Sequence, residues 1–177
     1  MRRAILGLLC LWPVWVVAGC AGPSLKSQGD AYLLTNRPGD AVSCYEQALA
    51  RDLELAVDAS FVSQLRRARG LVAYALGRQQ AAAGRWDDAV DRFRHSVEQD
   101  PSLERAKAAL KRARREASKV HHKKALEYAD RGQLNQAIVE LKKALELDPG
   151  NLDAKDALDS LQKKKQDSLS RAQKLYE

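Results

Sequence analysis

Asp88-Ala89-Val90 has two counterparts in this 177-residue chain, Asp40-Ala41-Val42 before it and Gln136-Ala137-Ile138 after it. The three alanines stand at positions 41, 89 and 137, a constant period of 48 residues. The same period relates two further sets (Tyr45, Phe93 and Leu141; Asp52, Asp100 and Asp148). Fixed periods of this order are typical of helical hairpins that bury an apolar face only against their neighbours. The sequence therefore predicts an all-α solenoid of about three hairpins that share one apolar seam.

The remaining composition favours helices over strands. Charged residues make up 30% and hydrophobic residues 45% of the chain, and no stretch alternates with a period of two. Prolines occur only at positions 13, 23, 38, 101 and 149. The pattern predicts alternating long and short helices (57–83, 104–131 and 152–176; 39–51, 87–99 and 135–147). Gly84 and Gly132 are expected to end long helices in the left-handed conformation, and Ser102 and Asn151 to cap the helices that follow.

The units resemble the tetratricopeptide repeat, a family of 34-residue helical hairpins. The resemblance spans about residues 24 to 151 and rests on three units in phase. The second and third are the clearer ones (Leu76-Gly77, Gly84, Ala89, Phe93, Ser96 and Pro101; Ala125, Tyr128, Gly132, Ala137, Leu141, Ala144 and Asp148-Pro149-Gly150-Asn151), and the first is more degenerate (Gly29, Tyr32, Ala41, Tyr45 and Ala48). The resemblance implies small residues where paired helices approach closely. The 48-residue period is longer than that of the family. Residues 104–117 and 152–165 carry the extra length, which adds about four turns, or ~21 Å, to a helix.

Two features of the long helices follow from this alignment. Gly70 stands where the third unit has Ser118, and it is a candidate position for a bend in the first long helix. Residues 152–177 repeat the first helix of a unit without a second helix, so they are expected to form a capping helix. Its polar outer face would include Lys163-Lys164-Lys165.

The N-terminus carries a targeting pattern. Met1-Arg2-Arg3 precedes an apolar segment that ends in Val17-Ala18-Gly19-Cys20, which resembles the lipobox of bacterial lipoproteins. The resemblance implies a signal peptide at 1–19, an acylated Cys20, a tether at 20–24 and a repeat domain at 25–177. An uncleaved transmembrane anchor is the alternative, but the segment is short and contains Pro13. By analogy with sorting rules, Ala21 after the cysteine favours the outer membrane, facing the periplasm.

Candidate chemistry is sparse. Of the three cysteines, only Cys44 lies beyond Cys20, so we expect a buried thiol and neither a disulfide nor a cysteine-based zinc site. His121 and His122 are adjacent on a helix and point about 100° apart, so they cannot chelate one metal, and we interpret them as a solvated, partly packed pair. No phosphate-binding loop or nucleophile motif occurs. We therefore predict a protein that is not an enzyme and has no metal or cofactor.

Positive charge is concentrated between residues 104 and 131, which contain ten Lys or Arg residues against four acidic ones. One side of this helix is especially basic (Lys107, Lys111, Arg114, Arg115, Lys119 and Lys123). It could be a solvated helix face, or a surface for an acidic protein segment or anionic headgroups. Export makes a nucleic-acid partner unfavourable.

The tetratricopeptide resemblance also implies a concave face lined by particular first-helix positions (Leu71, Tyr74, Arg78 and Ala81; Lys119, His122, Leu126 and Ala129). This lining is apolar and basic, and it lacks the asparagines of the carboxylate clamp found in some relatives. We expect it to bind a protein segment of acidic or amphipathic character. The predicted partner-binding residues are Tyr74, Arg78, Lys119, His122 and Lys123. The sequence thus favours an envelope-anchored scaffold for an envelope, pilus or secretion complex; alternatives are a binder of anionic glycan or lipid headgroups and an accessory subunit of an envelope enzyme.

Overall fold

The computed structural model describes residues 24–174, and that part of the chain is helical without strands. The elements are α1 (Leu25–Leu34), α2 (Pro38–Arg51), a short 3-10 helix η1 (Leu53–Ala56), α3 (Ala59–Ala82), α4 (Trp86–Gln99), α5 (Glu104–Asp130), α6 (Leu134–Leu147) and α7 (Leu152–Lys174). The six predicted helices match the bounds of α2 to α7 to within two residues, except that the predicted end at 176 lies outside the described residues; α1 and η1 were not predicted. The all-α prediction is confirmed. The expected signal peptide and Cys20 lie outside the described residues.

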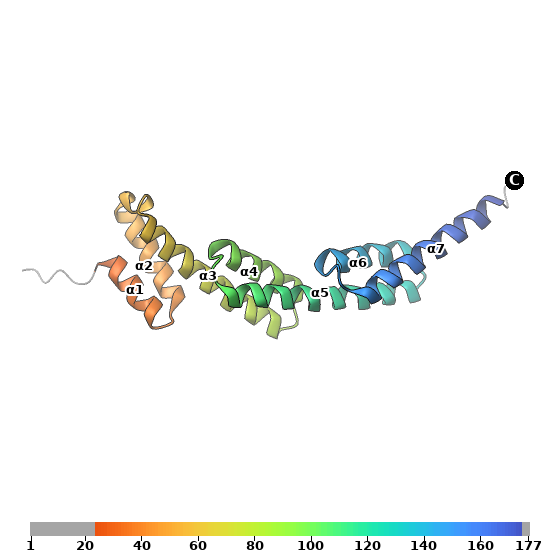
Figure 1. The fold of residues 1–177 in the computed structure, drawn as a ribbon, viewed down its shortest axis with the longest axis horizontal. Coiled ribbons are helices and arrows are strands. Elements are labelled where there is room, and N and C mark those ends of the chain that lie inside the picture. The colour runs from red at the N-terminus through yellow and green to blue at the C-terminus, as the bar shows by residue number, and fades with distance from the viewer. Residues whose placement is uncertain (1–23, 175–177) are drawn as a thin grey trace, which may run out of the picture.

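The helices form three small bundles arranged along an elongated molecule (Figure 1). Module 1 contains α1, α2 and the first half of α3. Module 2 contains the second half of α3, α4 and the first half of α5, and module 3 contains the second half of α5, α6 and the start of α7. The long helices α3 and α5 therefore each belong to two modules.

The apolar core is divided in the same way. Buried residues form three separate clusters, one in each module, centred on Tyr45, Phe93 and Leu141. The prediction of one shared apolar seam is therefore wrong. The physical reason is helix length: α5 has 27 residues, about 40 Å of helix, so the hairpin at its end cannot stack directly on the hairpin at its start.

Within each module, a small residue on one helix faces a large residue on the next. A Cβ atom at Gly29 would lie 2.5 Å from the Tyr45 ring, and one at Gly77 would lie 2.7 Å from the Phe93 ring. Module 3 has Ala125 in the same place, opposite the smaller Leu141. These three pairs set the close approach of the paired helices, as the tetratricopeptide resemblance implies.

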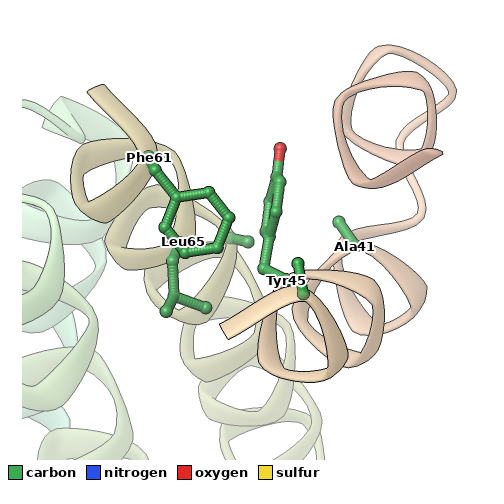
Figure 2. Packing of buried hydrophobic residues seen from close by; sticks show 6 residues of the cluster. Ala41, Tyr45, Phe61 and Leu65 are labelled. Atoms are coloured by element: carbon green, nitrogen blue, oxygen red, sulfur yellow. The ribbon is translucent and has the colours of Figure 1, made fainter. Parts of the chain in front are cut away.

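The core of module 1 is filled by aromatic side chains. Figure 2 shows Phe61 and Leu65 of α3 facing Tyr45 of α2. The Tyr45 and Phe61 rings meet edge to face, with centroids 5.5 Å apart. The Tyr45 hydroxyl donates a hydrogen bond to Asp30 at 2.5 Å. Burial, together with this contact, raises the pKa of Tyr45 above its ordinary value.

Gly70 does not interrupt α3, which runs unbroken from Ala59 to Ala82. Instead it permits close packing: a Cβ at Gly70 would lie 3.3 Å from the carbonyl oxygen of Ser96, whose hydroxyl donates to the Gly70 carbonyl at 2.7 Å. In module 3 the arrangement is reversed. Ser118 is on the long helix and donates to the Ala144 carbonyl at 2.7 Å. The α3–α4 and α5–α6 pairs thus each contain one buried serine hydroxyl, which comes from the short helix in the first pair and from the long helix in the second.

The helix ends largely follow the sequence signals. Gly84 and Gly132 both have φ of 73°, as expected, and Asn36 (φ 57°) occupies the corresponding place after α1. Asn151 caps α7 by accepting a hydrogen bond from the Ala154 amide at 3.1 Å. The predicted cap at Ser102 is wrong, because its hydroxyl donates to Asp100 at 2.6 Å and Leu103 occupies the N-cap of α5.

The last helix covers module 3 with its first part only. Ala154 is fully buried there, and Ala157, Leu158 and Leu161 pack beside it. Residues 162–174 are exposed throughout and extend beyond the bundle (Figure 1). The predicted capping role is thus confirmed for the beginning of α7. Among the described residues, no helix is both long and apolar enough to cross a membrane.

Candidate functional site

A groove of about 460 Å³ opens in module 2 between α3 and α5, with α4 beneath it. Its floor is apolar and aromatic, and its rims are basic. The lining residues are Tyr74, Arg78, Ala81 and Ala82 of α3, Trp86 and Phe93 of α4, and Arg105, Ala108, Ala109, Arg112 and Ala113 of α5. The hollow exists because α5 contributes alanines to the floor where a larger side chain would close it.

The aromatic residues of the groove are in contact with one another. Tyr74 and Phe93 have ring centroids 5.7 Å apart. The Arg105 guanidinium lies 4.9 Å from the centre of the Tyr74 ring, which is a cation–π geometry. These contacts hold the two rims at defined positions over the floor, so the groove has a shape before any ligand arrives.

The three arginines of the groove have no acidic neighbour. Within residues 24–174, no carboxylate lies within 4 Å of Arg78, Arg105 or Arg112. Some arginines elsewhere are paired; for example, Arg69 bonds Glu46 at 2.9 Å. Exposed pairs of this kind neutralise local charge even when they add little stability. The groove therefore presents three uncompensated guanidinium groups around an apolar floor.

The repeat provides an internal comparison for the groove. Forty-eight residues earlier, module 1 has large apolar side chains in place of the floor alanines, since Phe61 corresponds to Ala109 and Leu65 to Ala113. Forty-eight residues later, module 3 has Asp153 in place of Arg105. The same fold thus has three different surfaces at this place. Of these, the module 2 surface combines an open floor with a basic rim.

The predicted partner-binding residues do not form one site. Tyr74 and Arg78 line the module 2 groove. Lys119 and His122 line a separate concavity of about 400 Å³ beside the turn between α6 and α7. Lys123 is exposed and lines neither of these two hollows. The concave-face positions of 34-residue repeats are separated here because the four additional turns of α5 move one unit away from the next.

Sequence reasoning missed the half of the groove that α5 provides. Arg105 and Arg112 belong to the inserted residues 104–117, which have no counterpart in a 34-residue repeat. Trp86 was missed because it lies at the start of the second helix of the hairpin, outside the positions used to predict the concave face. A comparison of Ala108-Ala109 with the corresponding Ser60-Phe61 could have revealed an unfilled place.

His121 belongs to a polar cluster outside the groove. The interpretation of His121 and His122 as partly packed is confirmed, but His121 is not solvated. Its Nδ1 lies 2.6 Å from Glu140 of α6, and its Nε2 lies 3.2 Å from Asp87 of α4. The side chains of His121 and Glu140 are only 12% and 8% exposed. The cluster thus joins module 2 to module 3. His122, by contrast, is half-buried.

Electrostatic contacts control the ionisation of Glu140. Burial opposes its charged form, but hydrogen bonds from His121 and Lys124 and the nearby Lys143 outweigh burial and lower its pKa. Lys124 Nζ donates to Glu140 at 3.1 Å, and the pKa of Lys124 is raised in return. Among the described residues, no three His, Cys, Asp or Glu side chains are placed to hold a metal ion. Cys44 is free and buried in module 1, as expected.

Comparisons with known proteins identify the type of repeat. Residues 24–57 and residues 118–151 each match the family described as tetratricopeptide repeat. The first span covers α1 and α2, and the second covers the end of α5 and α6. The chain therefore carries tetratricopeptide-type repeats in an all-α solenoid. No curated protein matches the sequence.

Three solved structures show similarity over 78% of this chain. They are the second TPR domain of human RPAP3 in complex with the HSP70 peptide SGPTIEEVD (20% identity, 92% of that chain, TM-score 0.25), the first TPR domain of human RPAP3 (19%, 87%, 0.25) and the first TPR of Spaghetti (RPAP3) bound to the HSP90 peptide SRMEEVD (18%, 88%, 0.22). A likeness at this level says nothing of what the present chain binds.

Proposed function

We propose that this chain is a lipid-anchored, non-catalytic scaffold of the bacterial cell envelope, and that module 2 binds a segment of a partner protein. The observation that carries the proposal is the module 2 groove, where three arginines without acidic partners surround an aromatic floor. Tetratricopeptide-type repeats support an interaction role for the fold as a whole. The lining of the groove indicates the chemical character of the partner segment.

The spacing of the arginines indicates which segment would fit. Arg105 and Arg112 are seven residues apart on α5, so their positions are separated by two turns, about 10 Å. An extended segment covers that distance in about three residues. Side chains alternate between the two sides of an extended segment, so carboxylates that face the same surface are an even number of residues apart. The partner segment therefore carries two carboxylates four residues apart, about 13 Å, which the flexible arginine side chains can span, with an apolar side chain midway between them on the same side. The carboxylates accept charge-assisted hydrogen bonds from the arginines, and the apolar side chain enters the floor.

Anchoring is proposed from the N-terminal sequence. Val17-Ala18-Gly19-Cys20 favours cleavage before Cys20 and acylation of its thiol, and Ala21 favours retention at the outer membrane, facing the periplasm. A Cys20→Ser variant should not incorporate labelled palmitate. It should also no longer behave as a lipoprotein in detergent extraction of the membrane fraction. If mass spectrometry finds an unmodified thiol on an N-terminal Cys20 of the mature protein, this part of the proposal is contradicted.

Site-specific crosslinking in intact cells tests the binding part. Ala82 is exposed at the groove, and Asp130 is its exposed equivalent in module 3. A photoreactive amino acid at position 82 should give a defined adduct with one partner, and one at position 130 should not. The adduct should disappear when Arg78 and Arg112 are both changed to Gln. Equal adducts from both positions, or an adduct that survives the arginine changes, would refute the groove as the binding site.

A further inference from the structure

A second basic surface lies on α5, separate from the module 2 groove. Four residues at intervals of four form a row along the helix (Lys107, Lys111, Arg115 and Lys119), and all four are exposed. The row is about 18 Å long. It borders a shallow hollow of about 420 Å³ whose lining shares no residue with the groove. We call these four residues the α5 basic row.

The middle of the row carries uncompensated charge. Lys107 pairs with Glu104 at 2.8 Å, and Lys119 pairs with Glu116 at 3.0 Å. In the part of the chain that the structure describes, Lys111 and Arg115 have no carboxylate within 4 Å. Beside them, Arg114 is held in place by hydrogen bonds to the last carbonyls of α6, both at 2.9 Å.

The other long helices show that the fold does not require this row. At the equivalent positions, α3 has Ala59, Ser63, Arg67 and Leu71, and α7 has Lys155, Asp159, Lys163 and Asp167. The α7 row alternates in sign, which stabilises a helix, whereas like charges four residues apart destabilise it. The α5 row thus retains mutual repulsion that its equivalents avoid. An anionic surface that covers the row would relieve this repulsion.

The shape of the surface identifies the kind of anion. The hollow beside the row has four cations against one carboxylate, that of Asp148. Its apolar lining consists of Leu110, Leu147 and Pro149 without an aromatic side chain, so it lacks the anchor pocket that a specific peptide needs. A line of separate cations suits many small anionic groups instead. Leu152, which is 67% exposed, lies beside Arg115 and Lys119, where it can enter the boundary between headgroups and acyl chains.

We propose that the α5 basic row binds anionic phospholipid headgroups and lays the elongated molecule along a membrane surface. Lys ammonium and Arg guanidinium groups both donate to phosphate oxygens, and each cation near an anionic surface adds to the attraction. The inference does not depend on the partner of the module 2 groove, because the two surfaces use different residues of α5.

The test is sedimentation of the full chain with vesicles. The readout is the ratio of its partition onto vesicles of 70% phosphatidylcholine and 30% phosphatidylglycerol to its partition onto pure phosphatidylcholine. An apolar contribution of residues 1–23, which is the same for both vesicles, cancels in this ratio, and the charge of Arg2 and Arg3 is the same in every variant. Each lost cation should reduce this ratio about five- to sixfold, so changing both Lys111 and Arg115 to Gln should reduce it about 30-fold. Both side chains are exposed, so circular dichroism should show an unchanged fold.

The matched control removes the same charge elsewhere. Lys163 and Lys164 are exposed on the free part of α7, and changing both to Gln should leave the ratio nearly unchanged. An equal loss in both double variants would overturn the proposal, because net charge would then explain binding. A wild-type ratio of one would overturn it too, as would retention on immobilised polyglutamate without retention on the anionic vesicles. An Ala109→Phe variant, which fills the groove, should bind the anionic vesicles like the wild type.

Discussion

Filling the module 2 groove with a larger side chain should change the stability of the protein and its binding of a partner in opposite directions. Ala109→Phe reproduces on α5 the side chain that module 1 has at the equivalent position, Phe61. A phenylalanine ring that becomes buried stabilises by up to about 3 kcal/mol, and the lower helix propensity of Phe costs at most about 0.7 kcal/mol. We therefore expect the melting temperature of the variant to equal or exceed that of the wild type.

Binding should change in the opposite direction. The ring occupies the floor that would receive the apolar side chain of a partner. Loss of such an anchor, worth about 1.5–3 kcal/mol, weakens binding about 10- to 150-fold. Trp86 lines the groove and reports on it directly. In a background with Trp12 and Trp15 changed to Phe, Trp86 is the remaining tryptophan of the chain.

The assay is titration of Trp86 fluorescence with the probe peptide acetyl-Glu-Ala-Leu-Ala-Glu-amide. The same peptide with Gln for both Glu residues is the control for charge. The wild type should respond to the acidic peptide, less so as salt increases, and Ala109→Phe should respond at least tenfold more weakly. Ala75→Phe makes the same change at an exposed position of α3 outside the groove and should bind normally. Normal binding by a folded Ala109→Phe protein would refute the reasoning.

Three further predictions concern the cores. Gly77→Ala should lower stability by about 1–3 kcal/mol, because the new methyl group meets an aromatic ring, whereas Gly39→Ala, in open space on α2, should raise it by up to about 1 kcal/mol; equal melting shifts would contradict this. Ser118→Ala should cost about 1–3 kcal/mol in urea unfolding, since it removes two hydrogen bonds of the buried hydroxyl, one donated to the Ala144 carbonyl and one accepted from the Asn151 amide, and an unchanged midpoint would be inconsistent with those contacts. The pKa of Glu140 is lowered in the folded chain, so its stabilising effect is complete above the ordinary value of 4.5 and disappears as the pH falls through the lowered value. Glu140→Gln should therefore be less stable than the wild type at pH 7 and equally stable in strong acid, and a constant difference would show that His121 and its neighbours do not act through charge.

Periodicity made the helices predictable, because each buried position recurs in three copies. Ala41, Ala89 and Ala137 are all fully buried, and the repeated glycines end their helices as expected. The arrangement of the hairpins was not predictable from the 34-residue family. Fourteen additional residues preserve the apolar stripe of a helix but move the next hairpin by about 21 Å, and pattern alone cannot show whether the hairpins then still touch.

The residues of the candidate site likewise fall into a predictable group at family positions and an unpredictable group in the inserted turns. Tyr74 and Arg78 were predictable because they occupy family positions on the first helix of a hairpin. Arg105 and Arg112 were not, because they lie in the inserted turns and reach the groove only after α5 folds back over α4. The ion cluster of His121 was missed for a related reason: its partners, Asp87 and Glu140, are 34 and 19 residues away and come from two different modules.

A charge exchange across the interface tests the central claim most directly. Arg112→Glu should abolish binding of the partner captured at position 82. A compensating change to Lys at the partner carboxylate nearest Arg112 should restore binding, with a coupling free energy of about 1.5 kcal/mol or more in a double-mutant cycle. Additive losses, with no recovery for any acidic residue of the bound segment, would show that the module 2 groove does not bind the partner through its arginines.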